Sequence, residues 1–455
     1  MPKILYCFIL PLIMLLFFSE DKERDDIIAE QSFLTPEMFG AKGNGLDDDT
    51  SAIQLAINNS NGCPVLFDSK TYVVSQTIVL PDNSILIGHI TKIVNNNQTL
   101  PAVFLAYNAN KVIIDGFEID FRAKKTKKSN SRMFRDGVIT LSGEKGCNNS
   151  MISNCKIYNL NYLQSGIVLK GENVEISHCE VFSGAGNRMN AGIVCGSYDH
   201  SSPTSKSNGG CNYASVHDCY VHDISIGSKP DESGYGIYLL SCNYSSVYNC
   251  RVENCNWVCI NSQTEQNLPL GGHNYIYNNI TRLDSKKVCP RSDYIGPYNI
   301  YLEASPSSVV INNVIICGEV NSKRYIPLQI AWGCSDCLVK DNRFINTGKQ
   351  NTFALVGVDD KTVYDNNECN FSPSTYFFCY NTENPYLYVR NCNISATKRM
   401  INYLRNNSKS YNGILIMQDC KINAPMLKVS STGDVIKGEF VNCYYNERSL
   451  VSFSQ

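Results

Sequence analysis

The chain has 455 residues, with 40 Lys and Arg against 42 Asp and Glu, which gives a formal net charge of −2. Because neither sign of charge is in surplus, the composition argues against a nucleic-acid-binding protein and against an acidic disordered tail. The length suits one large domain or two ordinary ones.

The first 19 residues have the character of an export signal or an N-terminal anchor. Lys3 supplies a positive start, and residues 4–18 are almost wholly apolar. This run is shorter than the roughly 20 residues of a membrane span, yet it ends without the small residues of a cleavage site. We therefore expect a secreted, periplasmic or cell-surface protein that contacts a membrane only if the segment is not cleaved. Residues 20–34 are predicted to be a linker.

The stretch 37–50, EMFGAKGNGLDDDT, leads into a predicted helix over residues 50–58. Ala52, Ile53, Ala56 and Ile57 recur on one face of that helix. Asp48 or Asp49 is expected to cap it, because a carboxylate oxygen accepts the unpaired amide hydrogens of a first helical turn. Capping is favoured over a metal site for these aspartates.

This stretch resembles the opening segment of the pectate-lyase-like superfamily, in the branch of rhamnogalacturonase, epimerase-like and family 28 glycoside hydrolase proteins. That segment has a strand, FGAKGDG and a DDT-x-AI helix, and the following stretch 62–89 is similar to the first coil of the family. One departure is Ser69-Lys70 in place of the usual Pro-Gly. The resemblance implies a right-handed parallel β-helix over residues 35–455 and action on polysaccharides.

A short pattern recurs from about residue 110 onward: apolar, any, Asn or Asp, Cys or Asn, any, apolar. Its steps run from 23 residues (Cys420 to Cys443) to 40 residues (Cys179 to Cys219), which indicates a solenoid with loops of variable length. Alternating apolar residues and many β-branched residues make the units strands, about three in each coil. We predict an all-β, single-stranded parallel β-helix with a short N-terminal capping helix. The fourth position falls at Cys155, Cys179, Cys219, Cys250, Asn279, Asn313, Asn342, Asn366, Cys392, Cys420 and Cys443.

The regular spacing favours an interpretation of most of the 21 cysteines as buried core residues rather than disulfides or metal ligands. Asn residues at the same position would form hydrogen bonds along the bend. His178, His217 and His222 lie in or beside the pattern, so structural roles are favoured for them.

A second strand recurs in the middle of the chain, as GIVLKG, GIVCGS, GIYLLS, WVCINS, NIYLEA and PLQIAW. If inward and outward residues alternate, two outward columns form a strip suited to a sugar chain, because rings stack on sugars and amides bond hydroxyls. The first column is Val168, Val194, Tyr238, Cys259, Tyr301 and Gln329. The second is Lys170, Gly196, Leu240, Asn261, Glu303 and Ala331. Long insertions beside the strip carry His200, Asp231, Glu232, Glu265 and Arg291.

Two mechanisms and a non-catalytic role stay open. A glycoside hydrolase, slightly favoured, needs two carboxylates, for which the candidates are Glu303 with Asp231, Glu232 or Glu265. A polysaccharide lyase acting on a uronate polymer needs a base and a cation. The candidates for the base and the cation of a lyase, and for substrate binding, are Lys170, Tyr238, Tyr301, His200 and Arg291. Asn261 and Gln329 are further candidates for substrate binding. The third alternative is a glycan-binding or adhesion module.

The resemblance carries no catalytic residue over. The NTD, paired-Asp, GHG and RIK motifs of family 28 hydrolases are not found in the sequence, and Gly88-His89-Ile90 lacks the second glycine. No cofactor is predicted, and calcium is considered only for the lyase alternative. The expected partner is a polysaccharide and not a nucleic acid. The sequence makes no prediction of the oligomeric state.

Overall fold

The computed structural model describes the chain from Phe33 to Ser454 with gaps. The predicted signal or anchor segment and nearly all of the linker lie outside it. The described residues are 33–122, 137–160, 165–182, 191–196, 209–226, 234–264, 271–288, 296–322, 325–331, 333–348, 352–356, 361–371, 374–380, 386–396, 399–403, 412–423, 429–430, 435–445 and 448–454.

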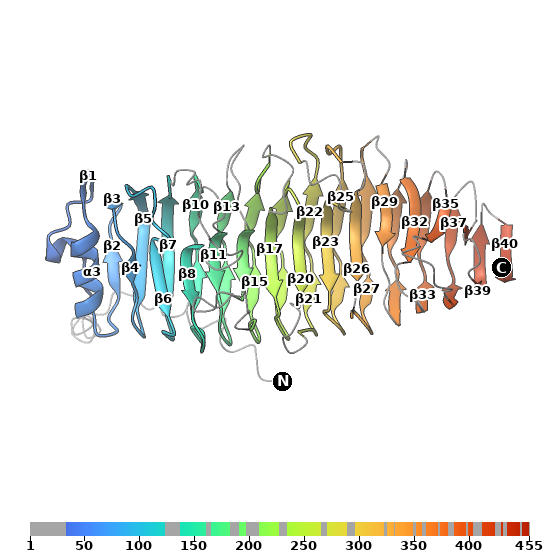
Figure 1. The fold of residues 1–455 in the computed structure, drawn as a ribbon, viewed down its shortest axis with the longest axis horizontal. Coiled ribbons are helices and arrows are strands. Elements are labelled where there is room, and N and C mark those ends of the chain that lie inside the picture. Colours follow the sequence, from blue (N-terminus) through green and yellow to red (C-terminus); the bar gives the residue numbers. More distant parts are fainter. Residues whose placement is uncertain are drawn as a thin grey trace, which may run out of the picture.

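The described chain is a parallel β-helix whose coils stack along one long axis (Figure 1). Each complete coil contributes one strand to a 13-stranded sheet, here called sheet B, and two strands to a 27-stranded sheet, called sheet A. This confirms the prediction of about three strands in each coil. Crossovers between parallel strands of one sheet are right-handed in nearly all proteins.

Sheet B is formed by β4 (Ile78–Val79), β6 (Phe104–Tyr107), β8 (Gly137–Ser142), β11 (Ser165–Leu169), β14 (Ala191–Cys195), β17 (Tyr235–Leu240), β20 (Val258–Gln263), β23 (Tyr298–Glu303), β26 (Ile326–Ala331), β29 (Thr352–Val356), β32 (Ser374–Tyr380), β35 (Arg399–Tyr403) and β38 (Val429–Ser430).

Sheet A contains β1 (Asn44–Asp48), β2 (Val65–Phe67), β3 (Thr71–Val74), β5 (Ile85–Asn95), β7 (Ile113–Asp120), β9 (Met151–Ser153), β10 (Lys156–Tyr158), β12 (Glu175–Ser177), β13 (Glu180–Phe182), β15 (Ser215–His217), β16 (Tyr220–His222), β18 (Ser246–Tyr248), β19 (Arg251–Glu253), β21 (Tyr275–Tyr277), β22 (Ile280–Leu283), β24 (Val309–Ile311), β25 (Val314–Cys317), β27 (Leu338–Lys340), β28 (Arg343–Asn346), β30 (Thr362–Asp365), β31 (Glu368–Phe371), β33 (Tyr386–Arg390), β34 (Asn393–Ala396), β36 (Asn412–Gln418), β37 (Lys421–Asn423), β39 (Val435–Tyr445) and β40 (Arg448–Ser454).

The recurring pattern of the sequence forms the bend between the two sheet A strands of a coil. Its third residue adopts the left-handed conformation, as at Asn154 (φ 51°), Asp218 (φ 52°) and Asn312 (φ 55°). Asn and Asp tolerate this conformation better than other non-glycine residues, which explains the preference at this position. The fourth residue then points into the core, and Cys155 and Asn313 are both 1% exposed.

The inward residues form one ladder along the solenoid. Asn279 donates its backbone N–H to Asn313 Oδ1 at 2.9 Å, and Asn313 donates in the same way to Asn342 Oδ1 at 2.9 Å. The ladder continues through Asn367, whose Oδ1 accepts from the Asn342 N–H. The predicted member Asn366 is wrong by one residue, because Asn366 itself holds the left-handed position (φ 50°).

The cysteines pack as predicted. Among the 18 cysteines of the described chain for which the structure gives a state, none forms a disulfide, and all but Cys63 are buried. In the ladder the thiol of Cys179 donates to the carbonyl oxygen of Ser177 at 3.3 Å. Within the described residues, no group of three or more His, Cys, Asp or Glu side chains is arranged to hold a metal ion.

The helix α3 (Thr50–Asn59) covers the N-terminal end of the core, as Figure 1 makes plain. Its predicted apolar face is buried, with Ile53 and Ala56 fully inaccessible. Asp48 Oδ1 accepts from the backbone N–H of Thr50, the first helical residue, at 3.0 Å. Asp49, the residue before the helix, instead accepts from the Lys42 and Gly43 amides, so only Asp48 has the predicted capping contact.

The opposite end of the described chain departs from parallel strand pairing. There β39 and β40 pair in antiparallel fashion, with Lys437 opposite Ser454 and Tyr445 opposite Arg448. Across the described ranges, no helix has both the length and the apolar character needed to cross a membrane.

Candidate functional site

The outward face of sheet B carries a continuous set of tyrosines and amides in its central coils. Backbone pairing aligns Tyr238 with Asn261, Asn261 with Tyr301, and Tyr301 with Gln329. A second column aligns Leu240, Gln263, Glu303 and Ala331. We call the following set the tyrosine strip: Tyr235, Tyr238, Asn261, Gln263, Tyr298, Tyr301, Glu303 and Gln329.

The predicted alignment of β20 is wrong by two residues. Cys259 was expected beside Tyr238 and Tyr301, but Asn261 occupies that place and Gln263 lies beside Glu303. The cause is that two successive residues of β20 face the interior. Cys259 and Ile260 both belong to the core, and a Cβ on Gly236 would lie 2.4 Å from Val252 Cγ1. Strict alternation of inward and outward residues therefore fails at this corner.

The same corner brings tyrosines three residues apart onto one face. Tyr235 stacks on Tyr238 with ring centroids 5.1 Å apart, and Tyr298 stacks on Tyr301 at 4.9 Å. Trp257 meets Tyr298 edge-on at 5.7 Å. Tyr235, Tyr298 and Trp257 were not predicted as site residues, although the repeated Tyr-x-x-Tyr spacing in the sequence was a usable signal.

A polar network links the strip. Tyr301 donates its hydroxyl to Glu303 Oε2 at 2.8 Å. Tyr238 and the side-chain amide of Asn261 both donate to Gln263 Oε1, each at 3.2 Å. Burial raises the pKa of Tyr301, and the charge of Glu303 raises it further. The Tyr301 hydroxyl therefore stays protonated and remains a donor to the carboxylate.

The strip is more buried than the open surface that alternation predicts. Tyr238 is 1% exposed, Asn261 0% and Gln329 5%. Gln263, Tyr301 and Glu303 are half-buried and reach the solvent at the end of the strip. Glu303 is the only carboxylate in the described strands of sheet B. It is thus the one acidic group that these strands offer for chemistry.

The other predicted site residues divide into two groups. Lys170 follows β11 and is 5% exposed, and its ammonium donates to the carbonyl oxygens of Gly143 and Glu144 at 2.9 and 2.8 Å. The Lys170 ammonium is therefore already hydrogen-bonded to the backbone of the protein. His200, Asp231, Glu232, Glu265 and Arg291 lie outside the described residues.

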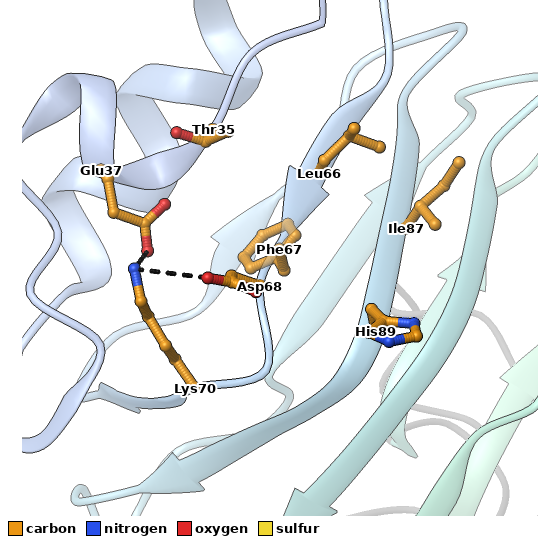
Figure 2. Close-up of a pocket in the computed structure, with 8 residues that line it drawn as sticks. All are labelled: Thr35, Glu37, Leu66, Phe67, Asp68, Lys70, Ile87 and His89. Carbon is orange, nitrogen blue, oxygen red and sulfur yellow. Dashed lines mark hydrogen bonds and ion pairs between the residues drawn. The ribbon is translucent and has the colours of Figure 1, made fainter.

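A separate groove of about 510 Å³ lies at the N-terminal end, on sheet A. Figure 2 shows Leu66 and Ile87 on neighbouring strands, with the charged cluster of Glu37, Asp68 and Lys70 on one side of the groove and His89 on the other. Glu37 belongs to the 3-10 helix η3 (Pro36–Phe39).

Lys70 Nζ lies 3.0 Å from Glu37 Oε1 and 3.8 Å from Asp68 Oδ2. The Tyr72 hydroxyl donates to Glu37 Oε1 at 2.6 Å. Although burial acts to raise the pKa of Glu37, these hydrogen bonds outweigh it and lower the pKa. Because these ionised groups pair with one another, the cluster ties η3 to the first coil, and the tyrosine strip is the better candidate site.

Comparison with known proteins finds no matching family model. A depolymerase specific for capsule K30/K69, from Klebsiella phage K5-2, is 43% identical over 49 residues, which is 11% of this chain and 6% of the relative. A glucan 1,3-beta-glucosidase of Cochliobolus carbonum is 33% identical over 76 residues, 16% of this chain and 10% of the relative. The matched segments thus span a small part of either relative.

Among solved structures, PfbA, a surface protein and adhesin of Streptococcus pneumoniae, superposes with a TM-score of 0.53 at 14% identity. The match covers 91% of this chain and 98% of that one. At this identity the likeness concerns the fold alone. The predicted fold, a right-handed parallel β-helix, is confirmed.

Proposed function

We propose that this right-handed parallel β-helix is an exported enzyme that hydrolyses a polysaccharide along the tyrosine strip. The observation that carries the proposal is the placement of Glu303. This carboxylate stands at the solvent end of the strip, receives the Tyr301 hydroxyl, and lies beside Gln263 in the neighbouring coil. Aromatic rings and amides beside a carboxylate suit the binding and cleavage of a sugar chain.

The role of Glu303 follows from its hydrogen bond. Tyr301 donates to Glu303, and a donor to a carboxylate favours its ionised form, which is the form that acts as base or nucleophile. Hydrolysis then requires a second, protonated carboxyl as general acid. Asp231, Glu232 and Glu265 remain the proposed sources of that group. A separation of about 5 Å between the two carboxyls would give retention, and about 6.5–9.5 Å would give inversion.

The partial relatives support a substrate of this class. One carries the name of a capsule depolymerase and the other that of a glucan 1,3-beta-glucosidase. Both names describe proteins that act on polysaccharides, which supports a polysaccharide as the substrate of the proposed activity. Because the matched segments are short, the sugar and the linkage are not transferred.

A lyase is less favoured by the contacts of its candidate residues. Lys170 was one proposed cation for a uronate carboxylate, but its ammonium is bonded to two backbone carbonyls. Tyr301, a proposed base, has a raised pKa, because of its burial and because of the negative charge of Glu303. A tyrosine held protonated is a poor base.

A non-catalytic glycan-binding protein is the second candidate. The specific observation in its favour is the burial of Tyr238, Asn261 and Gln329, which leaves a short open stretch rather than a long cleft. The fold is also compatible with such a role, because the adhesin PfbA shares it.

The test is activity of the protein on a panel of neutral and acidic polysaccharides, with reducing ends and absorbance near 235 nm read in parallel. New reducing ends without absorbance support hydrolysis. Both signals together indicate the unsaturated uronate of a lyase and contradict the role of Glu303. Retained binding without either signal supports the adhesin-like candidate.

A further inference from the structure

Two buried amide oxygens on the tyrosine strip accept no hydrogen bond from the residues that the structure describes. They are Asn261 Oδ1 and Gln329 Oε1. Both side chains are more than nine-tenths buried, at 0% and 5% exposure. They belong to the strands on either side of Tyr301, since Asn261 pairs with Tyr301 and Tyr301 pairs with Gln329. The two acceptors thus flank one tyrosine of the proposed site.

An unsatisfied acceptor of this kind is costly. Leaving a buried carbonyl oxygen without a donor disfavours folding by between about 5-fold and 150-fold in the equilibrium. The fold satisfies comparable amides elsewhere, because Oδ1 of Asn313 and of Asn342 each accept backbone and side-chain donors from the preceding coil. The two exceptions on the strip therefore call for a donor that the described part of the chain does not supply.

The strip as a whole offers acceptors rather than cations. Besides the two amide oxygens it presents the Glu303 carboxylate, and β17, β20, β23 and β26 contain no Lys or Arg. Such a surface pairs with hydroxyl donors and disfavours carboxylate, sulfate or phosphate groups.

We infer that Asn261 and Gln329 determine specificity, accepting hydrogen bonds from hydroxyl groups of a neutral polysaccharide. The inference rests on the proposed function and adds the class of substrate. It also predicts opposite effects on stability and on binding. Removing an unsatisfied oxygen should stabilise the free protein and lower its affinity for the polysaccharide.

The test variant is Gln329→Met, which keeps the shape of the side chain and removes both polar atoms. Its matched control is Gln418→Met in β36, where the side-chain oxygen accepts the Tyr388 hydroxyl. In the free protein we expect Gln329→Met to leave the melting temperature unchanged or higher and Gln418→Met to lower it. An equal loss in both variants would overturn the inference.

Binding supplies the second readout. Titration calorimetry in a Glu303→Gln background would use β-1,3-glucan, β-1,4-glucan and galactomannan as neutral probes, with polygalacturonate and alginate as anionic probes. We expect affinity for a neutral probe, weakened by at least about 5-fold in Gln329→Met and unchanged in Gln418→Met.

Tighter binding of the anionic probes, or an unchanged affinity in Gln329→Met, overturns the inference and leaves the proposed function standing. Failure to bind any of the five polymers overturns the proposed function and the inference with it. The two failures are therefore distinguishable.

Discussion

The hydroxyl of Tyr301 and the carboxylate of Glu303 form a hydrogen bond of 2.8 Å between two outward residues of one strand, β23. Residues two apart on a strand point to the same face, so the pair is fixed by the backbone rather than by a loop. The Tyr301 ring is held in turn by its stacking on Tyr298. A rigid aromatic side chain thus sets the position of the only acidic group on the described strands of sheet B.

Loss of this hydroxyl should impair catalysis without harming the fold. Tyr301→Phe keeps the stacked ring and removes one hydrogen bond to a charged group, which is worth about 10-fold to 100-fold in rate. We expect kcat to fall by that factor and the melting temperature to stay nearly constant. The control is Tyr277→Phe, a half-buried tyrosine stacked on Tyr248 in sheet A, which should retain full activity. Equal effects in the two variants would argue against a role for Tyr301.

Removal of the charge at Glu303 should abolish cleavage but preserve binding. Glu303→Gln retains the size of the side chain and eliminates a base or nucleophile, at a cost of about 10²- to 10⁴-fold in rate. Reducing-end release and polysaccharide affinity would be measured on the same preparation. Glu368→Gln, which affects an exposed ion pair with Arg343 on sheet A, serves as the control. Activity in Glu303→Gln close to that of the control would exclude Glu303 as a catalytic group.

Much of the fold was predictable because the bend repeats its chemistry. A residue that tolerates the left-handed conformation precedes a small inward residue in coil after coil, as in Asn154 with Cys155 and Asn312 with Asn313. The one misplaced member, Asn366, stands in a run of two asparagines where either fits the pattern. Only the burial of Tyr364, which is 2% exposed, fixes the alignment.

The site was harder to predict, since its alignment depends on a corner that the sequence does not mark. Cys259 and Ile260 both face the core, so a period of two fails at that point, and Asn261 and Gln263 move into the columns of Tyr301 and Glu303. The burial of the tyrosine strip was also not predictable from the sequence, because it depends on tertiary packing rather than on the pattern of residues along a strand.

The asparagine ladder should be a main source of stability. Asn342 donates to the carbonyl oxygens of Val310 and Lys340 and accepts from the Asn313 backbone. Asn342→Leu leaves at least two of these buried groups without a hydrogen-bond partner. We therefore expect a loss of about 2–6 kcal/mol in the free energy of unfolding.

Asn342→Cys should cost less, because cysteine occupies the same ladder position at Cys392, whose sulfur accepts from the Asn367 N–H at 3.4 Å. Chemical denaturation would compare the two variants, and a larger loss for cysteine than for leucine would contradict this account of the ladder.

Thiol reactivity should follow burial. Among the 18 cysteines whose state the structure gives, only Cys63 is not buried, so brief alkylation of the folded protein should label it well ahead of the others. Unfolding without reductant should then expose the remaining thiols for labelling. Peptide mass spectrometry reads both steps, and disulfide-linked ladder peptides would contradict the packing described here.

Two histidines on sheet A should make stability depend on pH. Burial acts to lower the pKa of His217, but hydrogen bonds to Glu175 and Asp218 outweigh it, and the pKa is raised. The pKa of His222 is raised in the same way by Asp223 and Glu180. A raised pKa in the folded state means that the stabilisation is complete below about pH 6.5 and is lost as pH rises through the folded value.

The melting temperature should therefore fall between about pH 6 and pH 8, and His217→Gln with His222→Gln should flatten that slope. His273→Gln is the control, because His273 stacks on Tyr244 and forms no ion pair within the described part of the chain. The control should keep the wild-type slope. A slope that survives in the double variant would assign the pH dependence to other groups and would leave the two histidines as packing residues stacked on Tyr248 and Phe182.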